Sequence, residues 1–162
     1  MRMFIATPSA RDAERFGAVH DAAWRQHYAD LFAPDYLAAN TAAQRAQALL
    51  DRLNDPDWAA RWALDQGAPA GILLLHRQGR SAQIDSLYLL AEHRGRGLGR
   101  RLVEAARDQA RAWGCACLTL WVLRDNPSAQ GFYRHCGFSP TGQTRTIQRG
   151  LPVCQIAYHM PL

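Results

Sequence analysis

The chain has 162 residues, of which 48% are hydrophobic and 20% are charged, and its formal net charge is +5. This length predicts one domain over residues 1–162 that can bury a hydrophobic core without disulfide bonds or structural metal ions. No apolar run is long enough to cross a membrane. All basic residues are arginines, scattered outside residues 94–101, so a nucleic-acid-binding module is weakly supported, and a cytoplasmic protein with no membrane or nucleic-acid partner is expected.

The first third of the chain predicts one strand followed by helices. Residues 2–7 alternate apolar and polar side chains, as a strand does, and Ser9 stands three residues before Asp12, as in a capping box. The helix that begins there runs toward Tyr28, and a second helix is predicted over residues 34–53. One face of the first helix carries an aromatic stripe that is more typical of core than of a pocket: Phe16, His20, Trp24 and Tyr28.

The middle of the chain predicts an antiparallel meander. Three strand-like segments, at residues 58–65, 70–77 and 83–90, are separated by short links that contain glycine. A helix is predicted after them over residues 99–113, with Gly114 as its C-terminal cap.

The last third adds a strand, a helix and two strands. Residues 117–123 predict a buried strand, and Asn126 before Pro127 is typical of a helix start. Residues 138–148 and 152–160 predict the final strands, so the fold class is α/β with a mixed sheet. The cysteines lack the spacing of a metal site, and no metal is predicted: Cys115, Cys117, Cys136 and Cys154.

The segment Arg94-Gly95-Arg96-Gly97-Leu98-Gly99-Arg100-Arg101 predicts an anion site. It joins a strand to a helix, where backbone N–H groups lack intrahelical partners and the helix dipole is positive. The arginines add charge, so a pyrophosphate is the expected ligand. A Walker A loop is excluded because the chain has no lysine, and the spacing of the glycines differs from a dinucleotide-binding fingerprint.

Two segments of the chain resemble the GCN5-related N-acetyltransferase (GNAT) superfamily, the acyl-CoA-dependent N-acyltransferases. The first runs from Ile84 through Arg101 and contains the glycine-rich loop. The second is Asn126-Pro127-Ser128-Ala129 followed by Phe132-Tyr133 and Cys136-Gly137-Phe138. The resemblance implies a GNAT-like domain whose splayed central strands bind coenzyme A, with acetyl-CoA as cosubstrate.

The resemblance also implies which residues hold this cosubstrate. Backbone groups of Leu87, Tyr88 and Leu89 pair with the pantetheine arm as an added strand would, and the N–H of Leu89 donates to the thioester carbonyl. The loop holds the pyrophosphate. The implied cofactor-binding residues are Leu87, Tyr88, Leu89, Arg94, Gly95, Arg96, Gly97, Leu98, Gly99, Arg100, Asn126 and Tyr133.

The implied reaction is direct attack of a primary amine on the thioester in a ternary complex. Tyr133 matches the general acid that protonates the leaving thiolate. Asp85 is a candidate base because it shares strand parity with Gln83 and Leu87, although a surface role fits it equally well. A histidine of the first helix or ordered water is the alternative base.

The acceptor site implied by the resemblance lies between the first two helices and the last two strands. Trp24, Tyr28 and Phe32 are the candidate substrate-binding residues, and with Arg25 they favour a small-molecule or peptide amine with an apolar or acidic part. A non-catalytic acyl-CoA-sensing domain is the alternative function. A homodimer is one expected assembly, as in many members of the superfamily.

Overall fold

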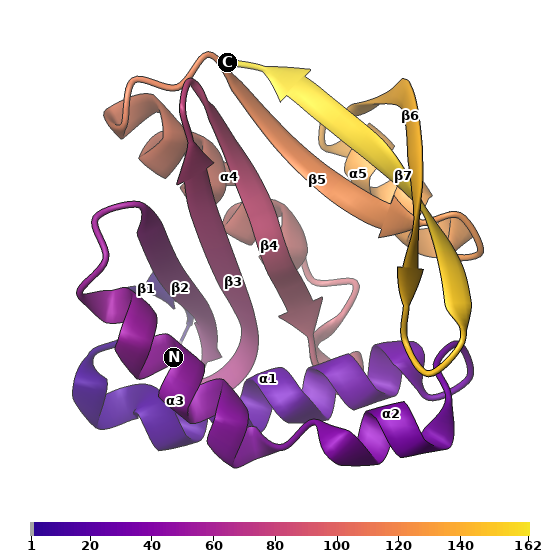
Figure 1. Ribbon diagram of the computed structural model, residues 1–162. Helices are drawn as coiled ribbons and strands as arrows, with labels where there is room; N and C mark the ends of the chain where they lie inside the picture. Colours follow the sequence, from indigo (N-terminus) through magenta and orange to yellow (C-terminus); the bar gives the residue numbers. More distant parts are fainter. Residues whose placement is uncertain (1) are drawn as a thin grey trace.

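A computed structural model describes residues 2–162 of the chain, and Met1 lies outside the described part. Within residues 2–162 the strands form one seven-stranded sheet in the order β1-β2-β3-β4-β5-β7-β6 (Figure 1). All neighbouring strands are antiparallel except β4 and β5, which are parallel. The mixed sheet and its meander confirm the predicted fold class. The strands are β1 Met3–Ala6, β2 Trp58–Asp65, β3 Ala68–Gln78, β4 Ser81–Leu89, β5 Cys117–Leu123, β6 Ser139–Gln148 and β7 Pro152–Pro161.

Helices cover both faces of this sheet. Helices α1 and α3 pack on one face, and α4 and α5 pack on the other, behind the sheet in the view of Figure 1. Short 3-10 turns precede α1 and α4 at Ala10–Asp12 and Ala91–His93. The helices are α1 Ala13–Tyr28, α2 Pro34–Ala39, α3 Ala42–Leu53, α4 Leu98–Ala112 and α5 Pro127–His135.

The second predicted helix is in fact two helices, α2 and α3. Asn40 adopts extended backbone angles, and its side-chain nitrogen donates to the carbonyl of Tyr36 at 2.8 Å. Thr41 then caps α3: its hydroxyl accepts from the N–H of Gln44 at 3.2 Å, while the Gln44 side chain accepts from the N–H of Thr41 at 3.0 Å. This reciprocal capping box ends one helix and starts the next.

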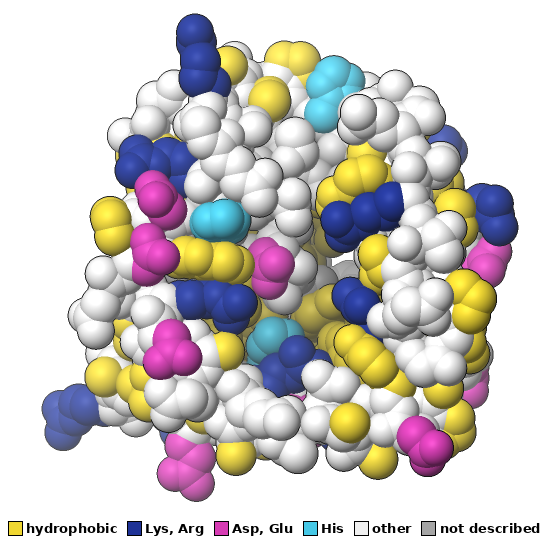
Figure 2. Space-filling view, in the orientation of Figure 1, with side chains coloured by type: hydrophobic (Ala, Val, Ile, Leu, Met, Phe, Trp, Pro, Cys, Tyr) yellow, Lys and Arg dark blue, Asp and Glu magenta, His cyan; other side chains and the backbone are white. Residues whose placement is uncertain are grey.

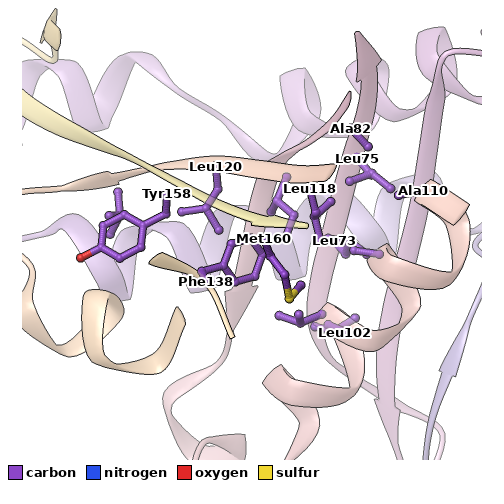
Figure 3. Close-up of a cluster of buried hydrophobic side chains, with 14 of the residues drawn as sticks. Leu73, Leu75, Ala82, Leu102, Ala110, Leu118, Leu120, Phe138, Tyr158 and Met160 are labelled. Carbon is purple, nitrogen blue, oxygen red and sulfur yellow. The ribbon is translucent and has the colours of Figure 1, made fainter. Parts of the chain in front are cut away.

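Two apolar layers hold the helices to the sheet. The layer under α4 and α5 contains Leu102, Leu118, Phe138 and Met160, which lie together in Figure 3. The layer under α1 and α3 is smaller and includes Phe16. Phe16 is fully buried, as the core reading of the aromatic stripe predicts.

Strands β4 and β5 pair only over their first halves. Residues Ser81–Ile84 pair with Cys117–Leu120, and no pair follows. Just past this point the pairing of β4 with β3 shifts, from Leu75 opposite Ile84 to Leu74 opposite Ser86, so that Asp85 is an extra residue in a β-bulge. The two strands diverge from there, as Figure 1 shows, which confirms the predicted splay.

Helices α1 and α3 approach closely at Gly17. A Cβ at this position would lie 2.6 Å from the carbonyl oxygen of Ala42 and 2.7 Å from the nitrogen of Ala46. Both are backbone atoms, which cannot move aside independently of α3. Glycine is therefore required for the observed separation of the two helices.

We expect Gly17→Ala to lower the free energy of unfolding by about 1–3 kcal/mol, because the added methyl group forces α3 away from α1. Gly131→Ala in α5 is the matched control, since a Cβ there has no atom within 4 Å. Because alanine favours the helix, the control should leave stability unchanged or raise it by up to about 1 kcal/mol. Urea unfolding followed by circular dichroism measures both. Equal effects would contradict the close helix contact.

Candidate active site

A cleft with a volume of about 540 Å³ opens where β4 and β5 diverge. Its walls come from α1, β4, β5, the glycine-rich loop and α5. Figure 2 shows the molecule hollowed in this region, with apolar side chains inside the hollow. The predicted site residues that line the cleft are Tyr28, Asp85, Leu87, Tyr88, Leu89, Arg94, Gly95, Gly97, Gly99, Arg100, Asn126 and Tyr133.

The glycine-rich loop presents bare backbone at one end of the cleft. Gly95 and Gly97 have φ angles of 75° and 84°, in the left-handed region that favours glycine. Gly97 is the N-cap of α4 and has no side chain to accept from the first N–H groups of the helix. Arg94 and Arg100 line the cleft beside these groups. Exposed amides, the helix dipole and two guanidinium groups form a site suited to a phosphate group.

Arg96 and Leu98 do not line the cleft. The Arg96 guanidinium pairs with the carboxylate of Asp65 at the end of β2. The Nδ1 of His93 lies 3.1 Å from the same carboxylate. The Leu98 side chain is fully buried in the core under α4. The Arg96 side chain ties the loop to β2.

One wall of the cleft carries a cluster of aromatic side chains that are all neutral. The hydroxyls of Tyr28 and Tyr88 lie 3.3 Å apart, and the Tyr88 ring packs against His20 and His27 with ring centroids 5.7 and 5.3 Å away. Burial raises the pKa of both tyrosines, so both stay protonated at neutral pH. Burial, reinforced by the charge of Arg94, lowers the pKa of His27 to about 4. The imidazole of His27 is therefore neutral.

Helix α5 supplies the opposite wall. Asn126 caps it, and its side chain accepts from the N–H of Ala129 at 3.2 Å, which confirms the predicted helix start. Two turns further, Tyr133 lines the cleft and packs edge-on against Phe132 and Phe138. Burial raises the pKa of Tyr133 well above its ordinary value. The phenol therefore holds its proton until a strongly basic partner appears beside it.

Asp85 lines the cleft from an irregular position of β4. The β-bulge at Asp85 interrupts the alternation of β4, so its side chain cannot be assigned a face by counting from Gln83 or Leu87. The residue is exposed at the cleft, and the hydroxyl of Ser86 donates to its carboxylate at 3.1 Å. Asp85 and Leu87 both line the cleft, as expected, whereas Gln83 does not, and the role of Asp85 as a base stays a prediction.

Of the three residues predicted to bind the acceptor amine, one reaches the cleft and two do not. Tyr28 lines it. Trp24 and Phe32, each 6% exposed, instead form a small core beneath it with Leu123. The Arg25 guanidinium is bound to Asp21 at 2.9 Å and to a backbone carbonyl, so its charge is already neutralised.

Sequence reasoning missed Trp121 and the arginines of the β6–β7 hairpin. Trp121 lines the cleft from β5, beyond the last residue that pairs with β4. The hairpin residue Arg145 lies over its ring. The hairpin contains no motif that could have singled out its arginines.

Two further features bear on the chemistry. Within residues 2–162 no three His, Cys, Asp or Glu side chains are grouped to hold a metal ion, and no helix there is both long and apolar enough to span a membrane. All four cysteines are free thiols. Cys136 lines the cleft, and burial raises the pKa of its thiol, which disfavours the reactive thiolate.

Comparisons with known proteins agree in one family. Residues 17–138 match the model of the Acetyltransferase (GNAT) family. The peptidyl-lysine N-acetyltransferase YjaB of Salmonella typhimurium is 33% identical over 119 residues, 73% of this chain and 74% of that protein. An uncharacterised N-acetyltransferase of Mycobacterium bovis is 30% identical over 141 residues, 86% of this chain and 90% of the relative. The PaiA N-acetyltransferase of Thermoplasma acidophilum, solved with coenzyme A, has the same fold, with a TM-score of 0.86, 20% identity and 100% of both chains covered.

The buried imidazole beside the cleft predicts a loss of stability in acid. Burial, followed by the charges of Arg45 and Arg52, lowers the pKa of His20 from 6.5 to about 3, and neither ring nitrogen has a hydrogen-bond partner within residues 2–162. Below pH 6.5 the unfolded chain takes up a proton that the folded chain does not. The free energy of unfolding should then fall by about 1.4 kcal/mol per pH unit from this residue until the pH nears the folded pKa, and be independent of it above neutrality.

Urea midpoints measured from neutral pH down to about pH 4.5 test this assignment. His20→Leu should reduce the acid slope and cost little stability at neutral pH, because it removes two polar atoms without partners. An unchanged slope would show that His20 is not the group responsible.

Proposed function

Because this chain belongs to the acetyltransferase (GNAT) family of acetyl-CoA-dependent acyltransferases, we propose that it transfers the acetyl group of acetyl-CoA to a primary amine of a small molecule or peptide. The observation that best supports this proposal is the cleft between β4 and β5, which has the bare amides of the glycine-rich loop at one end and Tyr133 in its wall. The arrangement supports direct attack by the amine, since no activated cysteine is present in the lining.

The chain's own residues would bind the cosubstrate in two ways. The N–H groups at the start of α4, with Arg94 and Arg100, suit the pyrophosphate. Residues 85–89 of β4 have no strand partner on the β5 side, so their backbone groups suit the amides of the pantetheine arm. The Arg96 side chain would act indirectly, by holding the loop against Asp65.

The proposed chemistry assigns one task to each of three groups. The amine nitrogen attacks the thioester carbonyl carbon, and the N–H of Leu89 stabilises the oxyanion that forms. The carbon–sulfur bond then breaks, and Tyr133 donates its proton to the leaving sulfur. Asp85 accepts the proton that the attacking nitrogen loses. The products are an amide and the free thiol of coenzyme A, so protons and electrons balance.

Tyr133→Phe tests the general acid. We expect kcat to fall by roughly 10²-fold or more while the KM for acetyl-CoA stays nearly unchanged, because the variant lacks only the proton donor. Thiol release from acetyl-CoA in the presence of a panel of amines gives both constants. Tyr158→Phe, which loses a hydroxyl bonded to Gln130 outside the cleft lining, is the control and should keep kcat. Equal losses in kcat and cosubstrate affinity for Tyr133→Phe would contradict the assigned role.

Asp85→Asn tests the general base. The variant keeps the size of the side chain but cannot take up the amine proton, so kcat should fall by roughly 10²-fold and recover partly at high pH, where more acceptor amine is already neutral. His27→Gln is the comparison, because the neutral imidazole of His27 also lines the cleft. Its loss in kcat should stay below roughly ten-fold. A larger loss in His27→Gln than in Asp85→Asn would transfer the role to His27.

A further inference from the structure

The tip of the β6–β7 hairpin lies near the cleft wall that Tyr28 and Leu31 form at the end of α1. This tip lies against the loop between α1 and α2, as Figure 1 shows. The N–H of Ala33 donates to the carbonyl of Arg149 at 3.2 Å. A Cβ at Gly150 would lie 2.4 Å from the Cβ of Ala33, so this close approach requires glycine there. The hairpin therefore holds its side chains at a defined place beside the cleft.

Two arginines of this hairpin stack on aromatic side chains, of which Trp121 lines the cleft while Phe32 and Tyr36 do not. The guanidinium of Arg145 lies 4.2 Å from the centre of the Trp121 ring, and its Nε donates to Gln155 at 2.7 Å. The guanidinium of Arg149 lies 5.5 Å from the centre of the Tyr36 ring and 6.0 Å from that of Phe32. Stacking on a ring occupies the face of a guanidinium and leaves N–H donors on its edge free.

These two positive charges lack acidic partners. Neither arginine forms a salt bridge with Asp or Glu anywhere in residues 2–162, whereas Arg25 and Arg45 share Asp21. Burial and the neighbouring positive charge of Arg149 lower the pKa of Arg145, so the two guanidinium charges repel each other. An anion between them would relieve that repulsion.

The opposite wall carries the opposite charge. Asp85 lines the cleft from β4, and its negative charge acts to raise the pKa of Arg145, although the two form no salt bridge. In Figure 2 basic side chains lie along the hollow on the side of the β6–β7 hairpin, and an acidic side chain lies on the β4 side. A molecule with an ammonium group and an anionic group can match both walls at once.

We propose that Arg145 and Arg149 form an anion subsite at the acceptor end of the cleft, and that the acceptor is a primary amine that also carries a carboxylate or a phosphate. This inference rests on the proposed function and narrows its substrate class. It places the amine toward Asp85 and the anionic group on the free guanidinium edges. Polyamines are disfavoured, because a second ammonium group would meet the two arginines.

Matched pairs of acceptors test the inference. β-Alanine and its amide differ in a carboxylate, and phosphoethanolamine and ethanolamine differ in a phosphate. The anionic member of at least one pair should show a kcat/KM higher by roughly ten-fold or more. That ratio should fall toward one in the double variant Arg145→Gln, Arg149→Gln. Whichever pair responds separates a carboxylate from a phosphate ligand.

Two further variants guard against a merely structural effect. Arg80→Gln removes one positive charge from the exposed β3–β4 turn, far along the chain from the hairpin, and should keep the ratio. The double variant Arg145→Lys, Arg149→Lys keeps both charges and should retain part of the preference for anions. Thermal unfolding of each variant shows whether the hairpin remains in place.

The proposed anion subsite can also be tested by measuring the binding of phosphate, which requires no catalytic turnover. Inorganic phosphate is titrated by calorimetry into protein saturated with coenzyme A, so that the glycine-rich loop is already occupied. The Kd for phosphate should rise by roughly ten-fold or more in the double Gln variant and stay unchanged in Arg80→Gln. Equal rates for both members of each pair, or phosphate binding that is undetectable or unaffected by the double variant, would overturn the inference. Failure to bind acetyl-CoA would instead remove the proposed function.

Discussion

The architecture depends on the end of pairing between β4 and β5 after Ile84 and Leu120. A parallel pair inside a sheet normally continues its hydrogen bonds, because unpaired backbone groups cannot be left buried at low cost. Here the bulge at Asp85 turns β4 away while its other edge stays bonded to β3. The open edge, the cleft and the approach of α5 all follow from that divergence, and Tyr133 reaches the cleft because α5 fills part of the space beyond β5.

Two sets of contacts tie together the elements that surround this opening. On one side the carboxylate of Asp65 holds Arg96 and His93, so the loop before α4 is tied to the β2–β3 turn. On the other side the β6–β7 hairpin rests on the α1–α2 loop through Arg149 and Ala33. Both ties join segments far apart in the sequence.

Local signals predicted much of this fold. Residues 117–123 form β5 as predicted, and Asn126 caps α5, because a buried apolar run and a cap-plus-proline pair act within a few residues. The division at Thr41 was also encoded locally, by its capping box with Gln44. Long-range features were not predictable. The bulge at Asp85 depends on the register with β3, and the partner of Arg96 is 31 residues away.

The same distinction between local and long-range features applies to the candidate site. It explains why motif residues such as Arg94 and Tyr133 line the cleft while Trp24 and Phe32 do not.

The tie between Arg96 and Asp65 has a thermodynamic consequence. A glycine-rich segment is ordinarily costly to immobilise, since glycine loses more conformational freedom than any other residue. With its arginine anchored and Leu98 buried before any anion arrives, the segment has little entropy left to lose on ligand capture, so more of the electrostatic attraction is available as affinity.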